Sequence, residues 1–321
     1  MCLALLVGIV AAPALAGDTA PLTVTASPVA LNPDDPNQTT IGALEYRGGI
    51  ALSSEDPRFG GLSGLDVSAD GARIVAISDR GFWFTARLEY DADGRLIGLS
   101  EPKITPLRGL DGHRLGFPWT DAEDIARLDD GEYAVSFERH HRIWIYPPGA
   151  PRRRHSARNG PKVPSAMASL PPNGGIETLT ELADGTLLAL SERGATFRGL
   201  RGWLFGKTGK MGRVAYQPAE DFAPTSAFTL ANGDVLVLER RFKVFKGRGT
   251  RLTLLSKASI TPGALLRGRE IAFMESPLTI DNFEGLAARR NKASETLLLI
   301  VSDDDFSSFQ RSLLMQFRLK R

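Results

Sequence analysis

The sequence predicts an all-β protein, a β-propeller with five blades, and three observations support this prediction. A pattern of two strands around a tight turn occurs five times along the 321 residues. Four of the turns are Asp-Gly or Asn-Gly, which accept the positive φ angles that tight hairpins need. The turn glycines are spaced by 60, 54 and 48 residues, at Gly71, Gly131, Gly185 and Gly233. A period of about 50 residues built only of strands is typical of propeller blades.

Each repeat has an alternating first strand and an apolar second strand. The second strands are rich in Val, Ile and Leu, which is typical of strands that are buried on both faces. The first strands begin at Gly61, Asp121, Gly175, Pro224 and Asn282. The second strands are expected at Arg73–Ser78, Tyr133–Phe137, Thr186–Ser191, Asp234–Leu238 and Thr296–Ser302. Further strands are expected at Phe82–Tyr90, Arg142–Tyr146, Arg251–Ser256 and Leu313–Leu319.

The last repeat ends close to the C-terminus, so its blade needs a strand from elsewhere in the chain. We expect an N-terminal strand, Leu22–Leu31 or Ala43–Leu52, to complete it. A sixth blade within residues 22–60 is the alternative. The proline-rich residues 147–173, which include the run Arg152-Arg153-Arg154-His155, are expected to form a long loop.

The N-terminus has the pattern of a secretory signal peptide. Residues 3–15 are almost entirely apolar and end in Ala14-Leu15-Ala16, a small-residue cleavage motif. A bilayer-spanning helix needs about 20 apolar residues, so this run is too short to cross a membrane. We therefore expect residues 1–16 to be removed and residues 17–321 to form a single propeller domain in the periplasm or outside a bacterial cell. A buried N-terminal helix is the alternative.

Composition excludes several classes of protein. With 42% hydrophobic and 24% charged residues, the chain is neither disordered nor of low complexity. The 39 Lys and Arg against 37 Asp and Glu give a net charge of +2, which argues against a nucleic-acid-binding protein. The single cysteine, Cys2, excludes an internal disulfide framework. We expect a monomer without stable membrane insertion.

The repeats predict a rim of charged side chains around the propeller axis. The first strand starts, and the second strand ends, at the same face of a blade. The starts carry Glu123, Glu177 and Glu284, with Ser63 and Ser226 at the equivalent places. The ends carry Asp79, Glu138, Glu192, Glu239 and Asp303. The next residues are Arg80, Arg139, Arg193, Arg240 and Asp304.

Converging carboxylates of this kind indicate a site for a hard cation, because Ca²⁺ takes six to eight oxygen ligands in irregular geometry. We expect Ca²⁺ at Glu123, Glu177, Glu284 and Asp303. The arginines can bind phosphate or carboxylate groups in bidentate fashion. The competing interpretation is architectural, with acid–arginine pairs that form salt bridges between blades.

Other motifs are weaker. His140-His141 follows a strand end, so His140 is a candidate general acid or base near the rim. Ser63 lies in a sequence that fails the Gly-x-Ser-x-Gly nucleophile pattern at its fifth position. Asp303-Asp304-Asp305 is a candidate metal ligand group or a solvated turn. The basic stretch from Arg240 to Arg251 is expected to be a solvated outer hairpin, or else a surface for an anionic ligand or membrane.

Several motifs in order resemble the bacterial exported proteins named for an "esterase-like activity of phytase", over about residues 40–320. They are Gly60-Gly61-Leu62-Ser63-Gly64-Leu65, Ile77-Ser78-Asp79-Arg80-Gly81, Asp121-Ala122-Glu123-Asp124, Gly175-Ile176-Glu177, Asp281-Asn282-Phe283-Glu284-Gly285-Leu286 and Val301-Ser302-Asp303-Asp304. The resemblance implies a propeller-like fold and a hydrolase of phosphate or other esters. The strand at Glu284 is also similar to the metal-binding inner strand of gluconolactonase-type propellers. The Arg-His-Gly-x-Arg-x-Pro motif of histidine-acid phytases does not occur in the sequence.

Together these patterns predict a metal-assisted ester or phosphoester hydrolase that acts on a small anionic substrate. The expected catalytic residues are Glu177, Asp79, Glu192 and His140, and the expected substrate-binding residues are Arg80, Arg193 and Arg240. A lactonase would share the metal and differ in its substrate. The alternative from another class is a non-catalytic exported propeller that binds a small ligand or an envelope protein through the same rim.

Overall fold

The computed structural model of the chain describes residues 20–152, 155–243 and 245–320. The predicted signal peptide, residues 1–16, lies outside the described residues, as do Arg153 and Arg154 of the basic run. The described residues contain 24 strands, one short helix, α1 (Ser165–Ala168), and two 3-10 turns. The predicted all-β class is therefore confirmed, and no described helix has the length and apolar character needed to span a bilayer.

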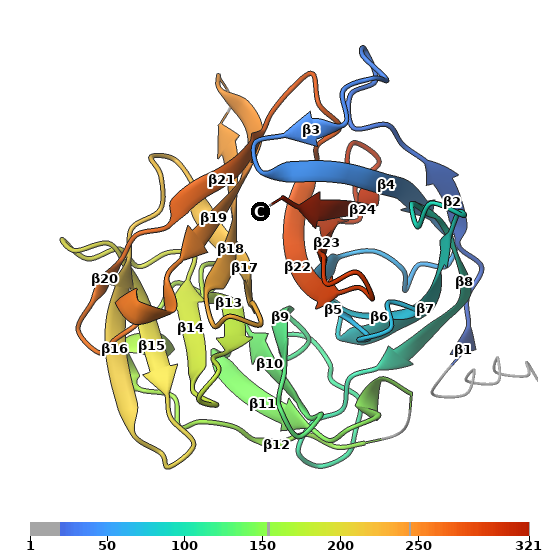
Figure 1. Cartoon of the computed structure of the whole chain (residues 1–321). Helices are drawn as coiled ribbons and strands as arrows, with labels where there is room; N and C mark the ends of the chain where they lie inside the picture. The colour runs from blue at the N-terminus through green and yellow to red at the C-terminus, as the bar shows by residue number, and fades with distance from the viewer. Residues whose placement is uncertain (1–19, 153–154, 244, 321) are drawn as a thin grey trace, which may run out of the picture.

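Hydrogen bonds group the strands into four sheets around one axis, of 11, five, four and four strands. The 11-stranded sheet contains two four-stranded units that meet at a single bridge, so the propeller arrangement of Figure 1 consists of five units. The innermost strands are β5 (Leu62–Val67), β9 (Ala122–Arg127), β13 (Ile176–Glu181), β17 (Ala223–Thr229) and β22 (Asn282–Arg290). The second strands are β6 (Arg73–Ser78), β10 (Tyr133–Phe137), β14 (Leu187–Ser191), β18 (Val235–Lys243) and β23 (Thr296–Asp303). The third strands are β7 (Phe82–Tyr90), β11 (Arg142–Tyr146), β15 (Leu200–Phe205), β19 (Gly247–Leu255) and β24 (Ser312–Leu319).

The fourth strands complete the units and close the ring. They are β8 (Leu96–Pro106), β12 (Arg158–Asn159), β16 (Met211–Tyr216), β21 (Arg269–Met274) and β4 (Leu44–Ser53). Short strands β1 (Ala20–Pro21), β2 (Thr25–Pro28), β3 (Thr40–Ile41) and β20 (Leu265–Leu266) extend the edges. Because β4 pairs with β24, the predicted closure by an N-terminal strand is confirmed. The described strands between residues 22 and 60 join existing sheets, and β4 also touches β8 through one bridge between Gly48 and Leu96.

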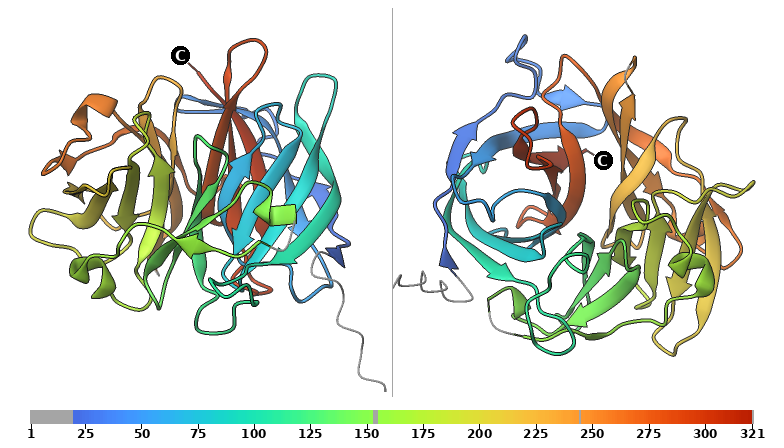
Figure 2. Two further views of the ribbon diagram at one scale, coloured as in Figure 1. Left: turned by 90° about the horizontal axis from the view of Figure 1, so that it is seen from below. Right: turned by 180° about the vertical axis from the view of Figure 1, so that it is seen from behind.

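Turn chemistry explains why the predicted strands end where they do. The four turn glycines have φ angles of 74°, 85°, 78° and 88°, a region that costs glycine little. One predicted boundary was too short, because β18 continues to Lys243 and pairs with β19 from Gly247 onward. The basic stretch is therefore a long hairpin that projects from the edge of the propeller (Figure 2).

Hydrogen bonds across the axis join the inner strands to one another. The Ser63 hydroxyl donates to the carbonyl of Ala122 over 2.9 Å, which links β5 to β9. Asp124 on β9 is fully buried and accepts the backbone N–H of Leu179 on β13 over 2.8 Å. The hydroxyl of Ser226 on β17 donates to the same carboxylate over 3.1 Å. Ser63 is thus buried and links two neighbouring blades. A nucleophile needs an exposed hydroxyl, and the hydroxyl of Ser63 is not exposed.

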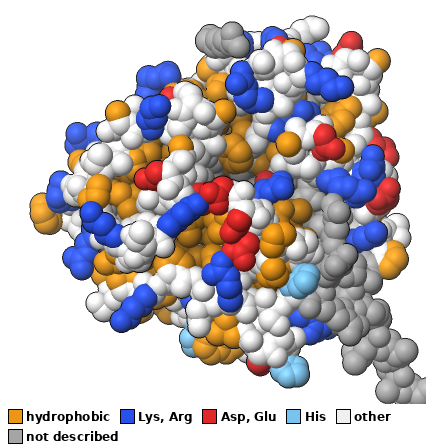
Figure 3. Space-filling model, turned by 60° about the horizontal axis from the view of Figure 1, so that its bottom comes forward, with side chains coloured by type: hydrophobic (Ala, Val, Ile, Leu, Met, Phe, Trp, Pro, Cys, Tyr) orange, Lys and Arg blue, Asp and Glu red, His pale blue; other side chains and the backbone are white. Residues whose placement is uncertain are grey.

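The end of the axis where the turns lie carries charges of both signs. Lys207 contacts Asp129 over 2.5 Å and Glu181 over 3.8 Å, and Arg127 lies 3.8 Å from Asp66. Figure 3, in which the lower part of Figure 1 comes forward, shows acidic and basic side chains close together around exposed hydrophobic surface. The carboxylates named here therefore have cations as neighbours.

Candidate functional site

The inner strands share one backbone feature, a β-bulge close to the start of each strand. In β13, Ile176 pairs with Ser191 and Thr178 pairs with Leu190, so Glu177 is the extra residue of the bulge. The other register shifts fall at Glu284 in β22, Thr225 in β17, Ser63-Gly64 in β5 and Glu123-Asp124 in β9. Bulges redirect side chains and are frequent beside active sites. The three inner glutamates predicted from the sequence all lie at these bulges.

The predicted alignment of the fourth repeat was wrong by one residue. Ala223 pairs with Arg240 in the way that Asn282 pairs with Asp303. Arg240 therefore occupies the strand-end position that the sequence pattern assigned to Glu239. The fourth blade contributes a cation to the rim where the other four contribute a carboxylate.

Glu239 and Ser226 take structural roles instead. Glu239 is buried, accepts a hydrogen bond from the Tyr216 hydroxyl over 2.5 Å, and pairs with Arg251 over 2.7 Å. Burial raises the pKa of Glu239, although these partners offset part of the effect. Ser226 follows the bulge residue and donates to Asp124 within the axis. The expectation that Glu239 is one of the rim carboxylates was therefore wrong, and Thr225, not Ser226, occupies the position equivalent to the inner glutamates.

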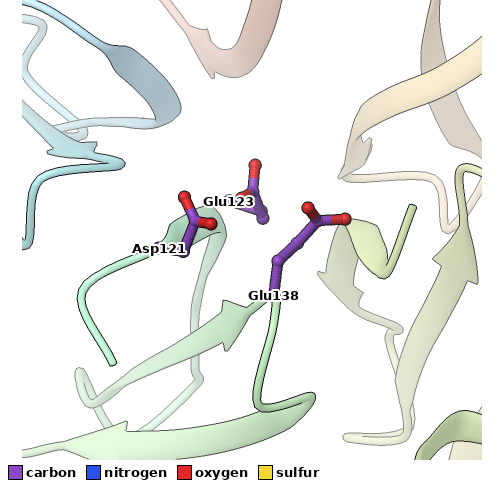
Figure 4. Close-up of side chains that lie close together, drawn as sticks. All are labelled: Asp121, Glu123 and Glu138. Atoms are coloured by element: carbon purple, nitrogen blue, oxygen red, sulfur yellow. The ribbon is translucent and has the colours of Figure 1, made fainter. Parts of the chain in front are cut away.

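Three carboxylates of the second blade form the closest cluster. One oxygen each of Asp121, Glu123 and Glu138 lies within 4.8 Å of the others. In Figure 4 the three side chains point toward a common space, from the segment before β9, from β9 itself and from the end of β10. Burial raises the pKa of Glu123 well above its ordinary value, and repulsion from Glu138 and Asp121 adds to the shift.

Glu138 and Glu177 come from neighbouring blades, and each carboxyl group affects the pKa of the other. Glu138 accepts the backbone N–H groups of Gly174 and Gly175. Burial raises the pKa of Glu138, although these two N–H donors oppose the shift. Burial raises the pKa of Glu177 well above its ordinary value, with further repulsion from Glu123, so its surroundings favour the protonated form.

Arg240, in the fourth blade, lies between carboxylates of the third and fifth blades. One Nη lies 3.2 Å from Glu192, and the other lies 3.2 Å from Glu284 and 2.7 Å from the amide oxygen of Asn282. Asn282 also donates to Glu284 over 2.8 Å. Burial by itself would lower the pKa of Arg240, but Glu284, Glu177 and Glu192 together raise it. Arg240 therefore stays charged and offsets part of the negative charge.

Asp79 and Asp303 extend the cluster into the first and fifth blades. Burial raises the pKa of Asp79 to about 7, and repulsion from Asp121 and Glu284 contributes. Burial also raises the pKa of Asp303 well above its ordinary value, with repulsion from Glu284 and Asp79. Its carboxylate accepts the backbone N–H of Asp305 over 2.7 Å. Because each of these groups affects the others, the rim is one electrostatic unit.

Two of the predicted substrate-binding arginines lie at the margin of this unit. The guanidinium of Arg80 lies 3.2 Å from the ring centroid of Phe306 and donates to the carbonyl of Pro57 over 3.0 Å. Arg193 has a side chain that is 64% exposed and lies 3.2 Å from Glu192. Of the three predicted arginines, Arg240 is the one that the structure brings among the carboxylates.

His140 has an aromatic partner. Its exposed ring stacks on Trp119, with ring centroids 3.9 Å apart and an angle of 12° between the planes. The neighbouring His141 uses Nε2 to contact the carbonyl of Leu170 over 3.1 Å. The catalytic role of His140 stays a prediction.

Sequence reasoning missed two contributors to the site, Asp121 and Asn282. Each lies two residues before an inner glutamate, so each occupies the same position in its repeat. That position faces the end of the second strand, as the pairing of Asn282 with Asp303 shows. Comparison of this position across the repeats is the signal that could have identified both residues.

The donor set fits a metal ion of the hard type. Asp121, Glu123 and Glu138 supply carboxylate oxygens, which Ca²⁺ and Mg²⁺ prefer. Several partly or fully buried carboxylates with one arginine among them are costly unless protons or a cation balance the charge. The pKa values of Asp79, Glu123 and Glu177 are raised because burial and neighbouring carboxylates disfavour the ionised form of each group.

Solved structures with a similar fold were found at low identity. A candidate gluconolactonase is 12% identical, with 95% of this chain and 94% of that chain covered and a TM-score of 0.44. Virginiamycin B lyase from Staphylococcus aureus is 10% identical, with coverages of 92% and 100% and a TM-score of 0.43. A luciferin-regenerating enzyme is 10% identical, with coverages of 81% and 92% and a TM-score of 0.39. These scores are all below 0.5, so our description of the fold rests on the strand order alone.

No curated protein sequence matches the chain. A family model does match, over residues 57–306, a span that contains every rim residue described above. This match confirms the resemblance that the repeated motifs indicate. The chain belongs to the Phytase-like family, whose description is "Esterase-like activity of phytase".

Proposed function

We propose that this protein is an exported, metal-assisted hydrolase of phosphate or carboxylic esters, with its active site at the acidic end of the propeller axis. The observation that supports the proposal most is the convergence of bulge glutamates from three blades on one arginine and one close carboxylate group. Clustered titratable groups with strongly shifted pKa values are typical of catalytic sites. Membership of the Phytase-like family supports the hydrolase class.

Asp121, Glu123 and Glu138 would hold the cation, with Glu284 and Asp303 as further ligands. We propose Ca²⁺, because every donor is a carboxylate oxygen and the arrangement is irregular. When bound, such an ion neutralises an anionic substrate and makes water a better nucleophile. Arg240, which is already shared between Glu192 and Glu284, would orient the phosphate or carboxylate group of the substrate.

Proton transfer would use the two kinds of carboxyl group at the rim. Ester hydrolysis adds water across a C–O or P–O bond, so one proton leaves the water and one reaches the departing oxygen. Burial and the neighbouring carboxylates favour the protonated form of Glu177, which would act as the general acid. Glu192 or Asp79 would accept the proton from water. Raised carboxyl pKa values suit such exchange near neutral pH.

The test is turnover of p-nitrophenyl acetate and p-nitrophenyl phosphate before chelation, after chelation and after Ca²⁺ is restored. We expect turnover of at least one substrate that is lost on chelation and recovered with Ca²⁺. If the metal binds in stoichiometric amount but neither substrate is hydrolysed, the non-catalytic binding propeller becomes the better account. If turnover persists unchanged after chelation, the metal-assisted mechanism is wrong.

A further inference from the structure

The β18–β19 hairpin has a composition that the proposed active site does not explain. Residues 240–251 contain six cations and no acid. The pairing of the two strands continues for three residue pairs beyond Arg240, to Lys243 and Gly247. At about 3.3 Å per residue, the hairpin extends roughly 10 Å past the rim.

The cations at the base and at the tip of the hairpin have different surroundings. At the base, Arg240 and Arg251 are largely buried and pair with rim and core carboxylates. Toward the tip, Lys243 and Lys246 are 52% and 56% exposed and share one partner, Asp221. The neighbouring Glu220 also acts on Lys246. Both lysines remain half-exposed, and because surface ion pairs are weak, the ammonium groups can exchange these partners for phosphate groups.

Two phenylalanines of the same hairpin are also exposed to solvent. Phe242 is 66% exposed and Phe245 is 100% exposed. Large hydrophobic side chains rarely gather on a surface without a partner, and such gatherings mark interaction sites. The combination of exposed aromatic rings and basic side chains is characteristic of surfaces that lie against a lipid interface.

Exposed hydrophobic side chains are concentrated at this end of the molecule. Among the described residues, nine large hydrophobic side chains are strongly exposed. Six of them lie on connections that leave from, or lead to, the acidic end of the strands: Leu110, Phe117, Trp119, Phe197, Phe245 and Phe309. A seventh, Phe242, lies on the part of β18 that continues past this end. The other two, Ile97 on β8 and Met211 on β16, lie on strands at the periphery.

Phenylalanines occupy the loops of three consecutive blades. Phe197 and Phe309, on the β14–β15 and β23–β24 connections, are 99% and 92% exposed. Arg198 follows Phe197 directly, and Arg311 lies two residues after Phe309. Phenylalanine has no polar atom to remain hydrated, and cations beside it can bind lipid phosphate. The same pattern on separate loops indicates one extended contact surface.

We propose that the β18–β19 hairpin, with Phe197 and Phe309, docks this protein on an anionic lipid surface. The phenylalanines would enter the interface while Lys243 and Lys246 bind the headgroups. A lipid surface accounts for the observations better than a soluble partner, because fully exposed phenylalanines and half-exposed lysines occur together on segments that emerge from one end of the fold. The inference does not depend on the hydrolase proposal.

The test is co-sedimentation of the full chain with vesicles of phosphatidylcholine, alone or with about one quarter phosphatidylglycerol. We expect binding to the mixed vesicles, weak binding to the neutral ones, and loss of binding at high salt. The double variant Phe242→Ser and Phe245→Ser should bind at least about tenfold more weakly. Lys243→Gln and Lys246→Gln should each weaken binding about fivefold.

Matched controls use the peripheral residues. Ile97→Ser and Met211→Ser also remove an exposed hydrophobic side chain and should bind the mixed vesicles as the unaltered chain does. Glu177→Gln should also retain vesicle binding, which separates this proposal from the hydrolase. Absence of binding to mixed vesicles, or equal binding by the double phenylalanine variant, would overturn the proposal. Retention on an insoluble polysaccharide without vesicle binding would replace the lipid with a glycan partner.

Discussion

The two ends of the propeller axis carry carboxylates in different electrostatic settings. At the turn end, Asp129 lies 2.5 Å from Lys207, and the hydrogen bond from this lysine lowers the pKa of Asp129. At the bulge end, Asp79 has acids as its strongest charged neighbours, and burial raises its pKa to about 7. Aspartate thus forms a surface ion pair at one end of the axis. At the other end its pKa is close to neutral pH, which suits proton transfer. Position relative to the bulge decides which of the two roles a residue takes.

The β13 strand gives the sharpest comparison, because it carries Glu177 at the bulge end and Glu181 at the turn end. Glu177→Gln should lower turnover by at least about a thousandfold, since it removes the proton-donating carboxyl group. Glu181→Gln, four residues away, should leave turnover within about twofold. Steady-state kinetics with the ester that proves active measures both. Equal losses in the two variants would mean that Glu177 acts through stability alone.

Asp124 lies between the two ends of the axis. Its substitution tests whether buried hydrogen bonds hold the inner strands together. Asp124→Ala leaves the N–H of Leu179 and the hydroxyl of Ser226 without their acceptor. We therefore expect the free energy of unfolding to fall by about 3 kcal/mol. Asp130→Ala, at an exposed turn, should cost under about 1 kcal/mol. Urea unfolding followed by circular dichroism gives both values. A small effect at Asp124 would show that packing alone holds the inner strands.

The pH dependence should differ between the metal-free and the metal-bound chain. The pKa of Asp79 is about 7 in the folded state and about 3.9 when unfolded, so between these values the folded state holds a proton that the unfolded state has lost. Stability of the metal-free chain should therefore fall as pH rises from about 4 to 7. Cation binding displaces the proton from the carboxyl group. Each unit by which the pH rises should therefore lower the Kd for Ca²⁺ by up to about tenfold.

Thermal unfolding and calcium titrations from pH 5 to 8 test this prediction. Asp79→Asn, which cannot ionise, serves as the control and should make both profiles less steep, with the remaining slope due to the other rim carboxyl groups whose pKa values are raised. Calcium affinity that does not change with pH would show that protons and the cation do not compete at the rim.

The smallest effect is expected at the turn end. Lys207→Met removes the partner of Asp129 and Glu181, yet the ammonium group is half-exposed and its closest contact is with the exposed Asp129. Water and salt screen such a pair, so the variant should unfold at nearly the same denaturant concentration as the unaltered chain. Denaturant unfolding at low and high salt provides the measurement. A larger loss would mean that the turn end is more than an ordinary charged surface.

The strand pattern could be predicted because period-two alternation, apolar second strands and Asp-Gly turns are local signals. The bulges could not, because an extra residue in one strand depends on its pairing with the next. In the fourth blade the bulge shifted the predicted alignment by one residue. The sequence pattern therefore assigned Glu239, rather than Arg240, to the rim. The inner glutamates Glu123, Glu177 and Glu284 were identified because each occupies a similar place near the start of its repeat.

Side-chain direction at strand ends was the other limit. Arg80 and Arg193 occupy equivalent sequence positions, one residue after a rim acid, but lie at the margin of the site. Successive residues at a strand end point in different directions, so sequence adjacency to Asp79 or Glu192 says little about contact. The sequence pattern also emphasised the glutamates and passed over Asp121, whose carboxylate belongs to the closest group.

The central claim is that the bulge end of the axis binds a divalent cation, and elemental analysis of the purified chain tests it most directly. The account predicts about one calcium ion per chain. Glu123→Gln should lose this ion, whereas Glu181→Gln at the other end of the axis should keep it. The absence of stoichiometric metal from the unaltered chain, or equal metal content in Glu123→Gln, would contradict the account and leave the rim as a set of inter-blade contacts.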